Sequence, residues 1–143
     1  MRMTRQQLDQ LVDRHFGYEA ADDVDGVLGS LADEVRHEVV PSPMGAQTDK
    51  EGIRSFYRML FASLRGEGVT PIRRLYGDDF LVDETLWNGR IVDGRPFLMP
   101  GRSGKVSFRL LHVFEVRDGR IAGEQVWCDL AAIQRQLGEG ASV

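Results

Sequence analysis

The spacing of apolar residues changes once along the chain, from a helical repeat in the first half to an alternating repeat in the second. Three segments of the first half carry apolar side chains at every third or fourth position, which predicts amphipathic helices that begin at Thr4, Asp23 and Thr48. Thr4 and Thr48 each precede a Gln or Glu by three residues and fit capping boxes, and aspartate is a common N-cap residue. Residues 35–40 alternate as a short strand, and residues 41–47 are expected to form a loop.

After Gly68 the alternating repeat predicts a series of strands. They are expected at residues 70–76, 80–87, 90–97, 106–117 and 120–128. Asn88-Gly89 and Asp118-Gly119 are typical two-residue hairpin turns, so we expect neighbouring strands to be antiparallel. A last helix is expected from Asp129, as its N-cap, to Gly138. Helices followed by antiparallel strands predict an α+β fold, and the length predicts one domain over residues 1–143.

Composition narrows the range of partners. The net charge is -4 and basic residues are spread along the chain, so nucleic acid is not an expected partner. The single cysteine, Cys128, excludes an intramolecular disulfide and a cysteine-based zinc site, and favours a reducing compartment. The polar N-terminus lacks a signal-peptide pattern, and no apolar stretch approaches the ~20 residues that span a membrane. We therefore expect a cytoplasmic protein without membrane contact.

Three blocks of sequence occur in the order found in a known superfamily. The first, within residues 16–41, contains the run Ala21-Asp22-Asp23-Val24-Asp25-Gly26 followed by Asp33-Glu34-Val35-Arg36-His37. The second is Gly52-Ile53-Arg54-Ser55-Phe56-Tyr57. The third, within residues 104–138, contains His112-Val113-Phe114-Glu115-Val116-Arg117-Asp118-Gly119 and closes with Trp127-Cys128-Asp129 and Gln136-Leu137-Gly138. Together they resemble the NTF2-like superfamily, and within it the branch of SnoaL-like polyketide cyclases and ketosteroid isomerases.

This resemblance implies a fold, a kind of ligand and an assembly. The fold is a cone in which a strongly curved antiparallel sheet wraps around N-terminal helices. Members commonly hold an apolar small molecule in the cone, need no cofactor, and dimerise through the sheet. Leu111 and Val113 make the outer face of one predicted strand apolar, which agrees with a homodimer. Because such folds carry both enzymes and binding proteins, the resemblance does not by itself fix an activity.

His112 and Asp83 are the first candidates for catalysis. The resemblance places His112 where ketosteroid isomerases keep an acid that stabilises an oxyanion, and its strand parity turns it to the same face as Phe108 and Phe114. A histidine there can donate to an enolate oxygen or transfer a proton. Asp83 shares a strand face with Leu81, and a carboxylate among apolar neighbours has the raised pKa of a general acid or base. Each could instead be structural, His112 as a core residue and Asp83 as a solvated one.

The best-known catalytic positions of related enzymes carry other residues here. By the same resemblance, the isomerase base falls on Val39, and the acid of cyclases and epoxide hydrolases falls near Val126. Asp129 is better explained as a helix N-cap. The isomerase tyrosine falls on His15, with Tyr18 one turn further on, and either side chain could position a substrate. The expected catalytic set is therefore His112, Asp83, Tyr18 and His15.

A second group of residues is expected to line the ligand site. It comprises His37, Tyr57, Trp87, Phe56, Val126 and Trp127. Glu124 and Gln125 point to opposite strand faces, and parity alone does not say which enters the cone. The three histidines show no helical His pair, so no metal site is expected. Residues 88–105 are rich in glycine and proline and form either a lid or a long hairpin.

Two functional hypotheses follow. In the first, the protein is an enzyme that performs cofactor-free acid–base chemistry, such as cyclisation, isomerisation, dehydration or epoxide opening, on an apolar oxygenated metabolite. In the second, it is a non-catalytic binding or assembly module of the same shape, which would explain the valines at positions 39 and 126. The first hypothesis requires His112 and Asp83 to face the same interior.

Overall fold

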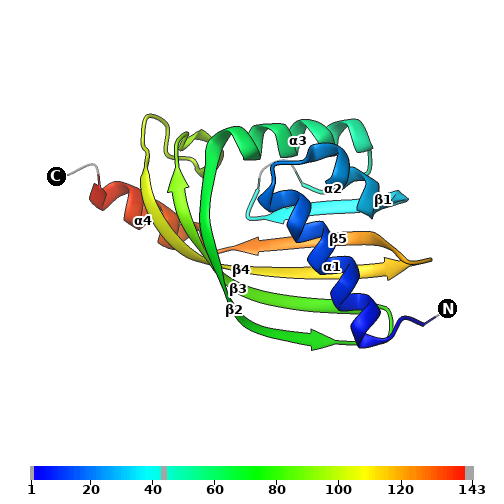
Figure 1. The fold of residues 1–143 in the computed structure, drawn as a ribbon. Helices are drawn as coiled ribbons and strands as arrows, with labels where there is room; N and C mark the ends of the chain where they lie inside the picture. Colours follow the sequence, from blue (N-terminus) through cyan, green and yellow to red (C-terminus); the bar gives the residue numbers. More distant parts are fainter. Residues whose placement is uncertain (1, 43–44, 141–143) are drawn as a thin grey trace.

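A curved five-stranded sheet and the helices that pack on one of its faces make up the fold (Figure 1). The computed structural model describes residues 2–42 and 45–140. The elements are α1 (Arg5–Ala20), α2 (Val24–Ser30), β1 (Leu31–Val40), α3 (Lys50–Ser63), β2 (Leu64–Tyr76), β3 (Phe80–Ile91), η1 (Arg95–Phe97), β4 (Gly104–Arg117), β5 (Arg120–Cys128) and α4 (Leu130–Gly140). The predicted α+β class is confirmed. The predicted loop at residues 41–47 lies partly outside the described residues.

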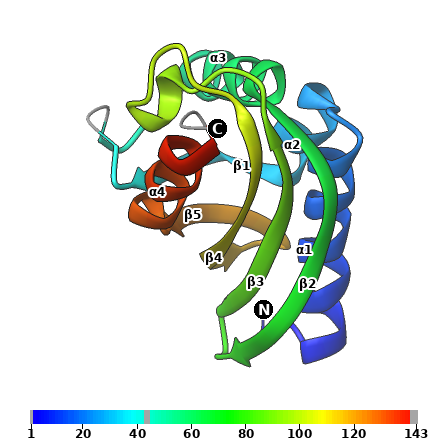
Figure 2. The same cartoon turned by 90° about the vertical axis from the view of Figure 1, so that its left-hand side faces the viewer.

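The strands lie in the order β1-β5-β4-β3-β2, and β2 through β5 pair as antiparallel neighbours. β1 pairs with β5 in parallel, so the expectation of a purely antiparallel sheet is wrong at this edge. The chain between β1 and β2 runs through α3, and Figure 2 shows how strongly β2 and β3 bend between α3 and the far end of the sheet.

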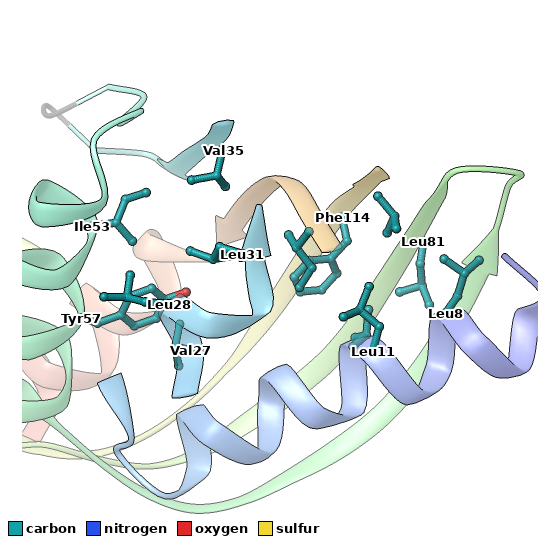
Figure 3. Close-up of a cluster of buried hydrophobic side chains, with 13 residues drawn as sticks. Leu8, Leu11, Val27, Leu28, Leu31, Val35, Ile53, Tyr57, Leu81 and Phe114 are labelled. Atoms are coloured by element: carbon teal, nitrogen blue, oxygen red, sulfur yellow. The ribbon is translucent and has the colours of Figure 1, made fainter. Parts of the chain in front are cut away.

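Alternation along β4 defines the face of the sheet that meets the helices, here called the inner face. Val106, Phe108, His112, Phe114 and Val116 are buried on it. Near the start of β4, the inner face packs with η1 and α4 in one apolar cluster. Near its end, the inner face packs with α1, α2 and α3 in a larger one, shown in Figure 3. Helices therefore cover the two ends of the inner face from different parts of the sequence.

Local signals set several boundaries as predicted. Thr4 closes a complete capping box with Gln7, Asp23 caps α2, and the side chain of Asp129 accepts a hydrogen bond from the backbone of Ala132 at the start of α4. Asp118 and Gly119 have positive φ values of 52° and 74° and form the turn between β4 and β5. Aspartate and glycine adopt that conformation most readily, which is why this hairpin signal was reliable.

Other boundaries differ from the prediction. The N-cap of α3 is Asp49 rather than Thr48, because the Asp49 side chain accepts from the backbone of Glu51. Asn88-Gly89 is not a turn but the continuation of β3, which pairs with both β2 and β4 there. A Cβ atom at Gly89 would lie 2.3 Å from the carbonyl oxygen of Arg65. The glycine therefore permits a close approach of β2 and β3 and does not mark a hairpin.

The segment after β3 packs on the last helix. Phe97 is buried, its carbonyl accepts a hydrogen bond from Gln134, and Met99 packs on the same apolar cluster. The strand predicted at residues 90–97 is thus replaced by the end of β3 and by η1. Pro96 lies in η1 at one of its first two positions, where the missing N–H leaves no helical hydrogen bond unmade.

Candidate active site

Seven polar residues meet beneath α1, where six elements converge, and are here called the buried polar cluster. They are His15 and Glu19 of α1, Ser30 of α2, His37 of β1, Tyr57 of α3, His112 of β4 and Glu124 of β5. Six of the seven are buried, and Glu19 keeps 23% of its side chain exposed. Polar groups buried in this number need partners, so their mutual contacts define what the site can do.

Register and helical spacing bring these side chains together. His15 and Glu19 are four residues apart and therefore lie on one face of α1. His37 is the cross-strand partner of Glu124 on the parallel β1–β5 pair. On the β4–β5 pair, His112 lies opposite Val126 and Phe114 lies opposite Glu124. Val126 and Glu124 of β5 therefore share the inner face with His112 and Phe114. The open choice between Glu124 and Gln125 is settled, with Glu124 facing inward.

His15 lies at the centre of the cluster. Ser30 donates its hydroxyl hydrogen to the carbonyl of Val27 at 2.6 Å, so its oxygen accepts from Nδ1–H of His15 at 2.7 Å. The other ring nitrogen, Nε2, lies 3.1 Å from Oε1 of both Glu19 and Glu124. Neither of these two contacts has hydrogen-bond geometry, so they act as ion pairs.

Tyr57 connects the two carboxylates with His37. Its hydroxyl lies 3.0 Å from Oε1 of Glu19 and 3.2 Å from Oε1 of Glu124, and its single hydrogen can serve one of them at a time. Nε2 of His37 lies 3.3 Å from the same hydroxyl and can donate to its oxygen. The phenol therefore bridges both acids to a second imidazole.

Electrostatics keep the centre of the cluster ionised. Burial opposes protonation of His15, but the charges of Glu124 and Glu19 outweigh burial and raise the pKa of His15 from 6.5 to about 10. Burial alone would raise the pKa of Glu124, whereas the adjacent His15 cation lowers it to about 2. Burial, followed by the charges of Glu124 and Glu19, raises the pKa of Tyr57 well above its usual value. At neutral pH the cluster holds an imidazolium, ionised Glu124 and a protonated phenol.

His112 has the opposite character. Burial lowers the pKa of His112 despite the nearby Glu19 and Glu124, so the ring is neutral near pH 7. Its Nε2 lies 4.0 Å from Oε2 of Glu124, while its buried Nδ1 has no hydrogen-bond partner among the described residues. Phe114 stacks on one face at 5.5 Å, and Phe16 makes an edge contact at 5.0 Å. Because the ring is neutral near pH 7, it has a free lone pair that can accept a proton, although burial makes it a weaker base than an exposed imidazole.

Asp83 lies on the inner face, but its carboxylate is paired with Arg74. It is 4% exposed and lies opposite His112 across β3 and β4. Arg74 donates to its Oδ2 at 2.6 Å and also binds Asp9 and Asp13 of α1. Asp83 therefore shares an interior with His112, as the sequence analysis required. Its charge, however, is neutralised in an ion-pair network that ties α1 to the sheet.

The remaining predicted residues divide into two groups. Phe56 lies beside His37 at 5.1 Å, and Trp87 packs on Phe108 at 5.2 Å, both on the helix side of the sheet. Tyr18 instead packs its ring over Gly26, where a Cβ atom would lie 2.3 Å from the ring. That contact makes Tyr18 a packing residue, and Tyr57 supplies the phenol of the cluster.

Trp127 corrects another expectation. It is 45% exposed, lies opposite Leu111 on the outer face, and donates to Gln125. The alternation that turns Glu124 and Val126 inward necessarily turns Trp127 outward, so it does not line the interior.

Glu19 and Ser30 were not expected from the sequence as members of the site, and Glu124 was expected there only as an alternative to Gln125. The pair His15-x-x-x-Glu19 was the signal available, because side chains four apart on a helix share one face. The donor atoms of His15, Glu19 and Glu124 lie within 4.8 Å of one another, close enough to ligate one metal ion. Two surface hollows near Asp79 and Arg117 have none of the seven cluster residues in their walls.

Comparison with solved structures identifies the fold. A protein of Jannaschia sp. CCS1 assigned as a SnoaL-like polyketide cyclase superposes with a TM-score of 0.80 at 19% identity, covering 96% of each chain. An LEH-like epoxide hydrolase of M. tuberculosis gives 0.72 at 20% identity, covering 96% of this chain and 93% of its own. TsrD from Streptomyces laurentii gives 0.76 at 26% identity, covering 95% and 98%. The fold is that of the NTF2-like proteins.

The family follows from the sequence itself. The profile of the SnoaL-like domain matches residues 12–124, which include every residue of the buried polar cluster. The chain belongs to the SnoaL-like domain family. None of the curated proteins compared with the chain matches it. No helix among residues 2–42 and 45–140 is long and apolar enough to cross a membrane.

Proposed function

We propose that the protein is an enzyme that performs acid–base chemistry on an apolar oxygenated metabolite at the buried polar cluster, without an organic cofactor. The observation that carries the proposal is the pairing of a neutral His112 with ionised Glu124 inside an aromatic interior. Cyclisation, isomerisation, dehydration and epoxide opening all need such a proton acceptor next to a stabilised charge.

His112 is the proposed base. Its Nε2 faces Oε2 of Glu124, and its Nδ1 is left to accept a proton from a substrate carbon or from water. The imidazolium that forms would be stabilised by the Glu124 carboxylate, as in other histidine–carboxylate pairs. Asp83, the base expected from sequence, is a poorer choice because Arg74 holds it as an ion pair.

His15 is the proposed electrostatic partner. Its positive charge, held between Glu19 and Glu124, lies close enough to His112 to influence that ring. A fixed cation in a low-dielectric interior stabilises negative charge that develops on a substrate oxygen. The hydroxyl of Tyr57 can donate to either carboxylate, and its hydrogen would move to the one that is more negative as charge develops on the substrate.

The structural relatives support this type of chemistry without specifying a reaction. They include proteins described as an epoxide hydrolase and a polyketide cyclase, at 20% and 19% identity. Phe16, Phe56 and Phe114 surround the histidines of this chain, which favours an apolar substrate that carries one polar oxygen.

The test is turnover of three substrate classes: a β,γ-unsaturated cyclic ketone, a cyclic terpene epoxide and an aromatic polyketide ester. Products are separated by chromatography and identified by mass. We expect one class to be converted, and His112→Ala to lower kcat about 10²–10⁴-fold, the usual contribution of a general base. Glu115→Gln, on the exposed side of the same strand, is the matched control and should retain the rate. Turnover by His112→Ala at the wild-type rate would remove His112 from the mechanism.

A non-catalytic binding module is the second candidate. It is favoured by the replacement of two known catalytic carboxylate positions with Val39 and Val126. In that case an apolar ligand would bind with saturation and be recovered chemically unchanged, and His112→Ala would alter affinity alone.

We also propose a homodimer formed through the outer face of the sheet. Leu75, Phe80 and Trp127 are 49%, 44% and 45% exposed on the side that β4 lines with Leu111 and Val113. An exposed apolar sheet face of this kind favours association with a second copy.

A further inference from the structure

We propose that His15, Glu19 and Glu124 bind a divalent transition-metal ion, with Ser30 orienting the histidine. This goes beyond the acid–base role proposed above and holds whether or not that role is correct. Nε2 of His15 and one carboxylate oxygen of each glutamate lie within 4.8 Å of one another. One imidazole nitrogen and two carboxylate oxygens form a donor set suited to zinc, manganese or iron(II).

The separations fit a shared ion. Nε2 of His15 is 3.1 Å from Oε1 of Glu19 and 3.1 Å from Oε1 of Glu124. Two donors at about 2.0–2.1 Å from one ion and this far apart subtend roughly 100° at it, within the range of tetrahedral and octahedral sites. Three protein donors leave at least one position for water or a substrate oxygen.

The contact between His15 and Ser30 resembles the support that metal-binding histidines usually have. Nδ1–H donates to the Ser30 hydroxyl at 2.7 Å, and that hydroxyl donates onward to the carbonyl of Val27. This chain of donors fixes the ring and, in the neutral tautomer, directs the lone pair of Nε2 at the two carboxylates. Ligand histidines commonly donate their other nitrogen to an acceptor in this way.

The buried atoms at the centre also lack adequate partners. Nε2 of His15 and Oε2 of Glu124 are buried, and neither makes a hydrogen bond within the described part of the chain. The ion pairs of Glu19 and Glu124 among the described residues involve histidines and no lysine or arginine. Two carboxylates this close in an interior need a positive charge between them. A divalent cation would supply that charge in place of the His15 proton.

An ion also has a route of entry and a neighbour that completes the site. The side chain of Glu19 is 23% exposed, so this ligand connects the interior with solvent. Tyr57 of α3 can donate to either of the same two carboxylate oxygens, and would orient the one that it reaches as a ligand. A metal site was not expected from the sequence, because the three histidines by themselves form no helical His pair.

In the experiment, the full chain is first treated with a chelator and then titrated with ZnCl₂ or with MnCl₂ in separate runs. Calorimetry measures the heat of binding. We expect one ion per chain and a rise in the unfolding temperature that grows with metal concentration. Glu19→Gln and Glu124→Gln should each weaken binding at least 100-fold, and Ser30→Ala should weaken it about 10–100-fold. Glu115→Gln, exposed on β4, is the control and should bind as the wild type does.

Two results would overturn the proposal: no saturable binding of either metal, or wild-type affinity in both glutamate variants. Should Glu124→Gln fail to fold, Glu19→Gln decides alone, because its side chain is partly exposed. Binding of Co²⁺, followed by its visible absorption bands, gives a readout of ligand number that needs no substrate. The metal test can therefore fail while turnover persists, and turnover can fail while metal binds.

Discussion

At the scale of single residues, Glu124 makes the most consequential contacts in the molecule. It has no exposed side-chain surface and faces His15, His37, His112 and Tyr57. It is the one fully buried carboxylate among these groups in the described residues, and Glu19, which also contacts His15 and Tyr57, is partly exposed. The contacts of Glu124 support both the proposed proton transfer and the proposed metal site.

Replacing Glu124 should therefore cost much stability. Glu124→Gln keeps the size of the side chain but leaves the His15 cation with Glu19 alone, and unpairing a buried charge typically costs about 3–5 kcal/mol. The free energy of unfolding, from urea denaturation of chelator-treated protein, measures this loss. Glu115→Gln serves as the control. A loss below about 1 kcal/mol would show that His15 is not charged in the native state.

Stability should also depend on pH at both ends of the range. The pKa of Glu124 is lowered from 4.5 to about 2, so its contribution is complete above pH 4.5 and is lost as the pH falls toward 2. The pKa of His15 is raised from 6.5 to about 10, so its contribution is complete below pH 6.5 and is lost as the pH rises through 10. Glu19, His37 and Tyr57 are the other polar groups that contact this pair.

We expect the metal-free chain to be most stable between pH 4.5 and 6.5, as followed by chemical denaturation across pH. In His15→Gln the free energy of unfolding should fall less steeply above pH 6.5 than in the wild type. Both proteins should still unfold at extreme pH. An alkaline decline that is the same in both proteins would contradict the assignment to His15.

At the scale of elements, the site depends on how the strands approach one another and on how α1 is fixed to them. Arg74 of β2 binds Asp83 on β3 and Asp9 and Asp13 on α1, which fixes the helix that carries His15 and Glu19. The parallel pairing of β1 with β5 places His37 beside Glu124. The long continuous β3 carries Asp83 and Trp87 on one face and extends past Asn88 and Gly89, where it still pairs with β2 and β4.

Gly89 tests the continuity of β3. Gly89→Ala would place a Cβ atom 2.3 Å from the backbone oxygen of Arg65, a clash that neither strand can relieve without moving apart. We expect a loss of at least about 2 kcal/mol in thermal or urea unfolding, in the upper range of single substitutions. Gly68→Ala on β2 is the matched control, because nothing lies within 4 Å of the added atom. Equal stability of the two variants would contradict the close approach of β2 and β3.

At the scale of the whole molecule, the helices cover the inner face, and no element in the described part of the chain forms a layer on the outer face of the sheet (Figure 1). The apolar side chains there are interrupted by Glu84, which is held by Arg73 and Arg109. An apolar surface whose buried carboxylate is paired with arginines suits a self-complementary interface.

We expect the 16.1 kDa chain to form a dimer in light scattering. Val113→Arg should shift it to a monomer, because two copies would bury like charges against each other. Asp33→Arg is the control, since its side chain is 93% exposed on β1, and it should leave the mass unchanged. If the wild-type chain stays monomeric at a protein concentration of tens of micromolar, the proposed dimer is wrong.

The sequence alone determined the features that depend on neighbours along the chain. Periodicity and capping residues indicated the helices, the hairpin at Asp118 and Gly119, and the apolar strand face that His112 shares with Phe108 and Phe114. Three motif blocks in order indicated the superfamily, which the family match confirms. Such signals are local, because they follow from dihedral preferences and from the period of each element.

Only the tertiary structure decided which polar groups meet. The parallel pairing of β1 with β5 joins His37 to Glu124, and Arg74 removes Asp83 from the reactive set. Neither fact follows from spacing, because cross-strand register and ion pairing between distant segments depend on how the whole chain packs. For the same reason Glu124 could not be chosen over Gln125 until its neighbours in space were known.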